Sequence, residues 1–229
     1  QMFYISSVFA LASILILSRM KETLPPTMKS RLKLSLFRIG WKDVFEPKII
    51  PVFWIMLFVS FSAGAMITLI PDTSKIIGWT NKGLYFTIYT VSSIVIRFFF
   101  SKASDQYGRI PVLIFGCFML SISMFLLVFS ANSYLLIASA IIYGIAWGFN
   151  TPTLAAWTND LGDKNHMGRA MATMYIALEA GIGIGAYVSG EIYQGIPNHI
   201  PIPFLIAGLL SLLAFLLLWK KKQAWTYGI

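Results

Sequence analysis

Seven apolar runs divide the chain, and each comes near the roughly 20 residues that a helix needs to cross a bilayer core. Polar or charged segments separate them. The runs cover residues 2–17, 50–70, 84–100, 110–129, 134–157, 170–189 and 201–219. Strands of a membrane barrel would be about 9–11 residues long with alternating polarity, and these runs are longer and do not alternate. The pattern predicts an all-α polytopic membrane protein with seven transmembrane helices.

The runs differ in their polar content, and the difference repeats. Runs 2–17, 110–129 and 201–219 are almost pure hydrocarbon, whereas the other four carry Ser, Thr, Tyr, Asn or Glu. A helix that faces only lipid can be wholly apolar, while one beside a wet cavity needs polar groups. The least polar runs are thus the first, fourth and seventh of the seven. This period predicts that the last six helices form two three-helix repeats, which are inverted because each contains an odd number of crossings.

Composition and charge agree with a membrane-embedded chain. Of the 229 residues, 57% are hydrophobic and 12% are charged. The net charge of +9 would suit nucleic acid, but 16 of the 18 Lys and Arg lie in alternate loops or at the C-terminus, and only Lys75 and Lys82 lie on the other side. By the positive-inside rule, the basic loops and the C-terminus are cytoplasmic and the start of the chain is outside. We therefore expect a multi-pass protein of the cell membrane, with the lipid bilayer as partner and no nucleic acid.

Four segments follow from this pattern: a helix in 1–18, a cytoplasmic segment in 19–49, a compact six-helix unit in 50–222 and a tail in 223–229. Basic and apolar residues alternate at near-helical spacing in KSRLKLSLFRIGWKDVF, which is typical of an amphipathic helix on an anionic leaflet; a solvated linker is the alternative. The first run has its basic residues after it rather than before it, so we expect a membrane helix and not a signal peptide. Because the chain starts at Gln1, we expect it to begin partway through a longer protein.

A short charged hinge, SKASDQYGRIPV, joins runs 84–100 and 110–129. Asp105, Gly108 and Arg109 in it match Gly-x-x-x-Asp-x-x-Gly-Arg-Arg/Lys, so that the hinge resembles the cytoplasmic loop signature of the major facilitator superfamily. Ser101 and Ile110 stand where that family usually has Gly and a second base. These departures suit the degenerate copy of the motif, which in the family joins the eighth and ninth helices.

The resemblance extends over most of the chain. Residues 148–186 are similar to the family's tenth helix, a cytoplasmic loop and the eleventh helix, and the basic segment 19–49 resembles the linker between its two six-helix halves. The resemblance implies that 50–222 is the C-terminal half, that 1–18 holds the last helix of the N-terminal half, and that the rest of that half is a missing partner. It implies a secondary transporter of a small organic solute that works by alternating access. The resemblance leans towards proton-coupled efflux of a drug or metabolite; proton-coupled uptake of a sugar or organic acid is the alternative.

We expect the hinge to act as a conformational gate. Gly108 allows a tight turn, and Asp105 can accept hydrogen bonds from a neighbouring helix N-terminus or pair with Arg97 or Arg109. Contacts made only when the cytoplasmic ends are together would favour the inside-closed state. The alternative is that these charges only solvate a loop and fix its side of the membrane.

Glu179 lies near the middle of run 170–189, where a charge costs roughly 2.5–3.5 kcal/mol. We expect it to face the bundle interior and to carry the coupled proton; a protonated packing residue is the alternative. An aromatic wall with few polar anchors suits a semi-apolar substrate, although packing is the alternative for each residue of such a wall. The substrate-cavity candidates are Ser60, Gly64, Thr68, Tyr143, Trp147, Asn150, Thr151 and Tyr175.

Small residues at four-residue spacing predict close helix packing in runs 134–157 and 170–189. They are Gly144 and Gly148 in the first run, and Gly181 and Gly185 in the second. The sequence GIGIG at 181–185 superficially matches a dinucleotide-binding loop, but no strand precedes it. We therefore expect the glycines to pack helices and not to bind a nucleotide.

No enzyme, metal site or cofactor is expected. His166 and His199 lie in separate loops without metal-ligand neighbours, and Cys117 is the one cysteine, so no disulfide pair exists within the chain. A seven-helix receptor is a remote alternative, because it fits the number of crossings and their orientation. The last run, however, contains no Lys that could hold retinal.

Overall fold

The computed structural model describes residues 2–19, 40, 44–130, 132–164 and 166–227, and the regular elements in these ranges are all helical. The chain divides into two units, 1–39 and 40–229, and each is treated by itself. The first unit contains α1 (Met2–Ser18), which is apolar apart from its serines. The amphipathic helix expected in the basic segment falls mainly on 29–39 and 41–43, outside the described residues.

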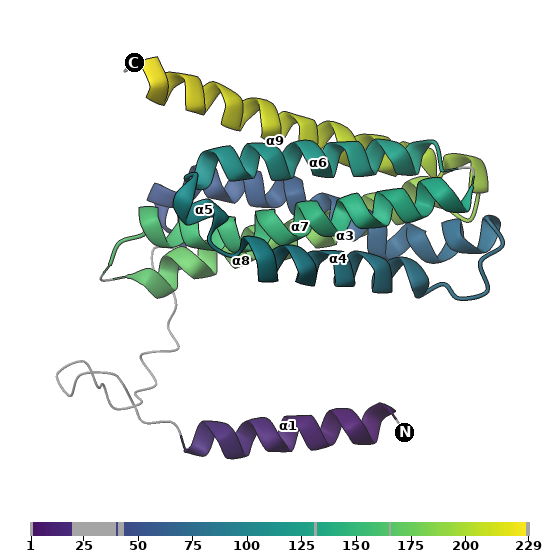
Figure 1. The fold of residues 1–229 in the computed structure, drawn as a ribbon, viewed down its shortest axis with the longest axis horizontal. Coiled ribbons are helices and arrows are strands. Elements are labelled where there is room, and N and C mark those ends of the chain that lie inside the picture. The colour runs from purple at the N-terminus through teal and green to yellow at the C-terminus, as the bar shows by residue number, and fades with distance from the viewer. Residues whose placement is uncertain (1, 20–39, 41–43, 131, 165, 228–229) are drawn as a thin grey trace. The chain divides into compact units, whose positions relative to one another are not determined.

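The second unit is a bundle of six long helices (Figure 1). They are α3 (Ile50–Ile76), α4 (Leu84–Phe100), α6 (Arg109–Val128), α7 (Ser133–Leu161), α8 (Met167–Tyr193) and α9 (Pro201–Tyr227). The short helix α5 (Ala103–Gln106) joins α4 to α6, and two 3-10 turns, η3 (Pro47–Ile49) and η4 (Pro197–His199), precede α3 and α9. Each apolar run of the sequence coincides with one helix, so the all-α polytopic fold is confirmed.

Five of the described helices are long and apolar enough to cross a membrane, judged by length and composition: α3, α6, α7, α8 and α9. The other two apolar helices, α1 and α4, have 17 residues each. Seventeen residues is close to the lower limit for a spanning helix. Several helices continue past their apolar runs, as α7 does for four residues after Trp157, because backbone hydrogen bonds carry the helix on into polar sequence.

The pairing of helices in the second unit has the symmetry of an inverted repeat. The most extensive contacts are α3 with α8, α4 with α7, α6 with α7, α3 with α9, and α6 with α9. If α3, α4 and α6 are exchanged with α7, α8 and α9 respectively, the pair α3–α8 becomes α7–α4, and the pair α6–α7 becomes α9–α3. The pair α6–α9 is unchanged by this exchange. This is the pairing that two three-helix repeats related by a two-fold axis must produce.

Glycines bring the backbones together at the two equivalent crossings, α3–α8 and α4–α7. A Cβ on Gly185 would lie 2.2 Å from the carbonyl oxygen of Phe61, and a Cβ on Gly144 would lie 2.3 Å from that of Tyr89. The small residues of α8 thus pack on α3, and those of α7 pack on α4, so the two rows do not pack against each other. The glycines concerned are Gly64, Gly144, Gly148, Gly181 and Gly185.

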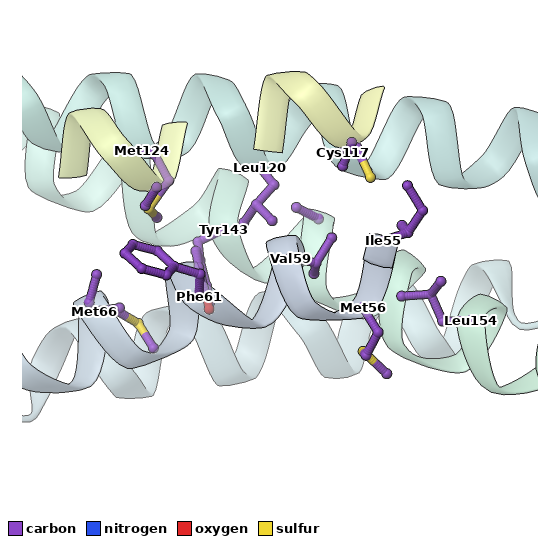
Figure 2. Close-up of a cluster of buried hydrophobic side chains, with 14 of the residues drawn as sticks. Ile55, Met56, Val59, Phe61, Met66, Cys117, Leu120, Met124, Tyr143 and Leu154 are labelled. Atoms are coloured by element: carbon purple, nitrogen blue, oxygen red, sulfur yellow. The ribbon is translucent and has the colours of Figure 1, made fainter. Parts of the chain in front are cut away.

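The interior lies where α3, α6 and α7 meet (Figure 2). Its labelled side chains are almost fully buried, and they are Ile55, Met56, Val59, Phe61, Met66, Cys117, Leu120, Met124, Tyr143 and Leu154. Lipid tails are as apolar as these side chains, so their contact stabilises the bundle by dispersion and close packing rather than by exclusion of water.

One end of the second unit carries most of its charge, and we name it the basic end. It comprises α5, the start of α6, the α7–α8 loop and the last turns of α9, which Figure 1 places together on the left. Arg109, Arg169 and Lys221 belong to it, whereas Lys75 and Lys82 lie at the opposite end. The positive-inside rule predicts that the basic end faces the cytoplasm.

Candidate functional site

The hinge at the basic end turns on a glycine. Gly108 has φ +88°, a left-handed conformation that disfavours any residue with a Cβ. Helix α6 begins at the next residue, Arg109, and Pro111 lies in its first turn, where a missing N–H costs little. The chain therefore reverses within a few residues, and Asp105 on α5 lies one short turn before Arg109.

Arg109 is the centre of the hinge's hydrogen bonds. Its Nε donates to Oδ2 of Asp160 at 2.7 Å, and its Nη1 donates to Oγ of Ser104 at 2.8 Å and also to Oδ1 of Asp105. Asp160 lies in the last turn of α7, 51 residues further along the chain. The side chain of Asp105 is still 62% exposed. The network ties α5 and α6 to α7 within one unit and leaves part of the Asp105 carboxylate accessible.

Arg97, the other expected partner of Asp105, lies elsewhere. It lines a small cavity of about 210 Å³ between the end of α4, α5 and the second half of α7, together with Phe100, Ser104 and Pro152. In the described part of the chain, the ion pair of Asp105 is with Arg109. The hinge therefore uses the arginine of its own motif.

A second junction at the basic end joins the segment before α3 to α8. The side chain of Glu46 is 3% exposed, and its Oε2 accepts hydrogen bonds from Nε of Arg169 at 2.9 Å and from Nη2 of the same residue. The backbone N–H of Glu46 donates to Oγ1 of Thr173 at 2.9 Å. Hydrogen bonding to the Arg169 guanidinium lowers the pKa of Glu46 below its ordinary value, although burial opposes this effect. A buried carboxylate thus holds the chain leading into α3 against the first turns of α8.

Several cavity candidates are buried within the six-helix unit. Tyr143 stacks on Trp147, with ring centroids 5.9 Å apart, and Tyr89 meets Tyr143 edge-on at 5.4 Å. The amide of Asn150 lies against Gly116 of α6, where a Cβ would come within 2.1 Å of Oδ1. These residues fill the space between helices in this conformation. Ser60 and Gly64 are likewise buried, while Thr68 and Thr151 are partly buried and bond to backbone carbonyls four residues earlier.

The outer face of α8 is different. Tyr175 and Tyr187 are 52% and 69% exposed, and Glu179 between them is also exposed. The three residues lie on one helical face because their spacings are four and eight residues. A Cβ at Gly183, on the same face, would meet no atom within 4 Å. An acidic and aromatic stripe therefore runs along an apolar helix and is exposed among the described residues of this unit.

Comparison with known proteins identifies the family. The sequence model of the Major Facilitator Superfamily matches residues 73–224, about two thirds of the chain. The chain belongs to the major facilitator superfamily. Among curated proteins, the quinolone resistance protein NorA of Staphylococcus aureus is 25% identical to this chain over 184 residues. The matched residues cover 77% of this chain and 47% of NorA. An uncharacterized MFS-type transporter of Methanocaldococcus jannaschii is 25% identical over 175 residues, covering 75% of this chain and 45% of its own.

The chain spans about half the length of the curated relatives that it matches. As a member of the major facilitator superfamily, it is a membrane protein. The matched residues begin in the last turn of α3 and continue almost to the end of α9, so they include the hinge, Arg169 and the stripe on α8, but not Glu46.

Sequence reasoning missed two acidic partners in this superfamily member, Asp160 and Glu46. One signal was available for Asp160: if α7 spans the membrane once, its last turn lies at the same end as the hinge that begins α6. No comparable signal marked Glu46, since its partner Arg169 lies 123 residues away and both belong to segments rich in charge.

Proposed function

We propose that residues 50–222 form the C-terminal half of a secondary transporter that moves a small organic solute by alternating access, and that α1 is the last helix of the preceding half. Membership of the superfamily supports transport, and coverage of about half of each relative supports the half assignment. Residues 19–49 are then the linker between the halves, with its final residues docked on α8 through Glu46.

The observation that carries this proposal is the stripe on α8. Glu179 lies near the middle of a 27-residue helix and is exposed on the six-helix unit. A carboxylate facing lipid at this depth would cost roughly 2.5–3.5 kcal/mol by insertion scales. A second half with a water-filled path between the halves would remove that cost. We therefore infer that the stripe faces the missing half, and that Glu179 binds and releases the coupled proton there.

The substrate class follows from the chemistry of the same face and from a relative. Tyr175 and Tyr187 offer aromatic surface beside one acidic group, which suits a semi-apolar compound that carries a basic nitrogen. NorA is named as a quinolone resistance protein. We propose drug or metabolite efflux, with a quinolone as the first compound to test.

The hinge is proposed as the gate of this transporter. Arg109 holds α5 against α7, and this fixes the position of the partly exposed carboxylate of Asp105. A hydrogen-bond donor on the other half could reach Asp105 only when the basic ends approach. A difference of about 1–3 kcal/mol between the two states would shift their balance about 5- to 150-fold.

The test is transport by the complete gene product in proteoliposomes, with an imposed pH gradient and a quinolone as substrate. We expect accumulation to follow the pH gradient in the natural protein and to lose that dependence in Glu179→Gln. Glu191→Gln is the matched control, because Glu191 is an exposed carboxylate in the last turns of the same helix.

The outcomes separate the parts of the proposal. Flux of Glu179→Gln that still follows the pH gradient would exclude Glu179 as the proton carrier. A gene product that inserts and folds but moves no quinolone, sugar or organic acid would refute the transport of a small organic solute.

A further inference from the structure

We propose that the basic end holds a specific site for an anionic phospholipid, at the place where α9 leaves the bundle. Figure 1 shows the C-terminal part of α9 diverging from α6. Two grooves adjoin this part of the chain, and both are lined by Trp157 and Lys221. One side of the site borders the hinge, because Gly108, Arg109 and Asp160 line the second groove. The site lies apart from the α8 stripe, and it does not depend on what the protein transports.

The first groove has the character of an acyl-chain site. It has a volume of about 480 Å³ and lies between α3 and α9. Trp54 and Phe58 of α3, Leu213 and Leu217 of α9, and the Trp157 ring line it. These residues belong to segments long and apolar enough to cross a membrane, and their apolar side chains suit a lipid tail.

The second groove has the character of a headgroup site. It has a volume of about 610 Å³ and is lined by Arg109, Asp160, Lys221 and Lys222, among others. Arg109 and Asp160 pair with each other. Lys221 takes part in none of the ion pairs formed by the described residues; its Nζ lies 4.8 Å from the centre of the Trp157 ring. An ammonium over an aromatic face keeps its charge and its hydrogen-bond donors available to an anion.

The shape and charge together specify an amphiphile. The apolar groove needs a hydrocarbon tail, and the adjoining ammonium needs an anionic group within a few ångströms of that tail. A phospholipid with a net negative headgroup provides both, and basic pockets between membrane helices bind such headgroups. The segment 20–43 is a poor alternative occupant, because its six Lys and Arg against two acidic residues would repel Lys221.

The test compares two neighbouring lysines by native mass spectrometry of the purified 229-residue chain, titrated with phosphatidylglycerol or phosphatidylcholine. Lys221 lines both grooves, whereas Lys220 lines neither and is exposed. Lys221→Gln and Lys220→Gln change the net charge equally at the same end of α9. A site predicts that Lys221→Gln weakens the first phosphatidylglycerol binding event about fivefold or more, and that Lys220→Gln weakens it less than about twofold. Phosphatidylcholine binding should be weaker from the start and nearly unchanged by either substitution.

Two further measurements test the apolar groove and the lipid tail separately. Leu213→Trp fills the apolar groove while leaving both lysines, and should weaken binding of either lipid. Glycerol phosphate, which has the headgroup charge without a tail, should not compete. Equal losses of phosphatidylglycerol affinity in Lys221→Gln and Lys220→Gln would mean that only general surface charge attracts the lipid, and this would overturn the site. Effective competition by glycerol phosphate would overturn a lipid as the ligand. A thermal melt of each variant confirms that it is folded.

Discussion

The seam between α3 and α8 gives the sharpest test of how this bundle is held together. A Cβ added at Gly185 would lie 2.2 Å from the Phe61 carbonyl oxygen. A carbon and a carbonyl oxygen in contact lie roughly 3.3 Å apart, so the backbones would have to separate by about 1 Å. The atom that blocks the Cβ belongs to the backbone and cannot rotate away.

The neighbouring contacts prevent a local adjustment. Gly181, one turn earlier on α8, would bring its Cβ to 2.6 Å from the Leu57 carbonyl oxygen, and Gly64 meets the α8 backbone from the other side. Overpacking of this kind costs typically about 1–3 kcal/mol, and the higher helix propensity of Ala returns about 0.5–1 kcal/mol. We expect Gly185→Ala to destabilise the chain by about 1–2 kcal/mol, which lowers the melting temperature by about 2–8 °C for a domain of this size.

Gly183 provides the matched control on the same helix. A Cβ there meets nothing within 4 Å, so Gly183→Ala should keep only the gain in helix propensity and raise the melting temperature by about 1–4 °C. Cys117 is the one cysteine of the chain and is fully buried, so a maleimide dye that fluoresces on reaction with a thiol reports unfolding. A Gly185→Ala chain as stable as the natural one would refute the close backbone contact, and so would equal destabilisation by the two substitutions.

Two further predictions concern the ion pairs at the basic end. Asp160→Asn should release α5 and α6 from α7 and reduce transport at least as much as Asp105→Asn does. The reason is that the Arg109–Asp160 bond joins two long helices, whereas the Arg109–Asp105 bond is local. Wild-type flux in both variants, with unchanged membrane insertion, would contradict the gate. Glu46→Gln should lower the melting temperature at neutral pH, because it leaves the Arg169 charge without its carboxylate. Since the pKa of Glu46 is lowered in the folded chain, its contribution is complete above the ordinary value of 4.5 and is lost as the pH falls through the lowered value. The melting temperatures of Glu46→Gln and the natural chain should therefore converge in acid, and a constant difference across this range would refute the assignment.

Local sequence was sufficient for the helices and for the hinge. An apolar run of about 20 residues has few alternatives to a helix, because every backbone group in lipid must be bonded within its own segment. The turn at Gly108 was equally predictable, since it combines a residue that tolerates positive φ with a proline in the next helical turn. The three-helix period in polar content also carried enough information to predict the inverted repeats.

The partners of these elements were decided only in the folded chain. Gly144 and Gly185 mark surfaces that must be approached closely, but nothing in their own segments says that the approaching helices are α4 and α3. Arg109 finds Asp160 across 51 residues, and Arg169 finds Glu46 across 123. Helix formation depends on neighbours three or four positions away, whereas these contacts depend on which helices the bundle places side by side. Sequence periodicity therefore determined the helices, and the packing of one helix on another determined which charges pair, which glycines touch and which polar side chains are buried.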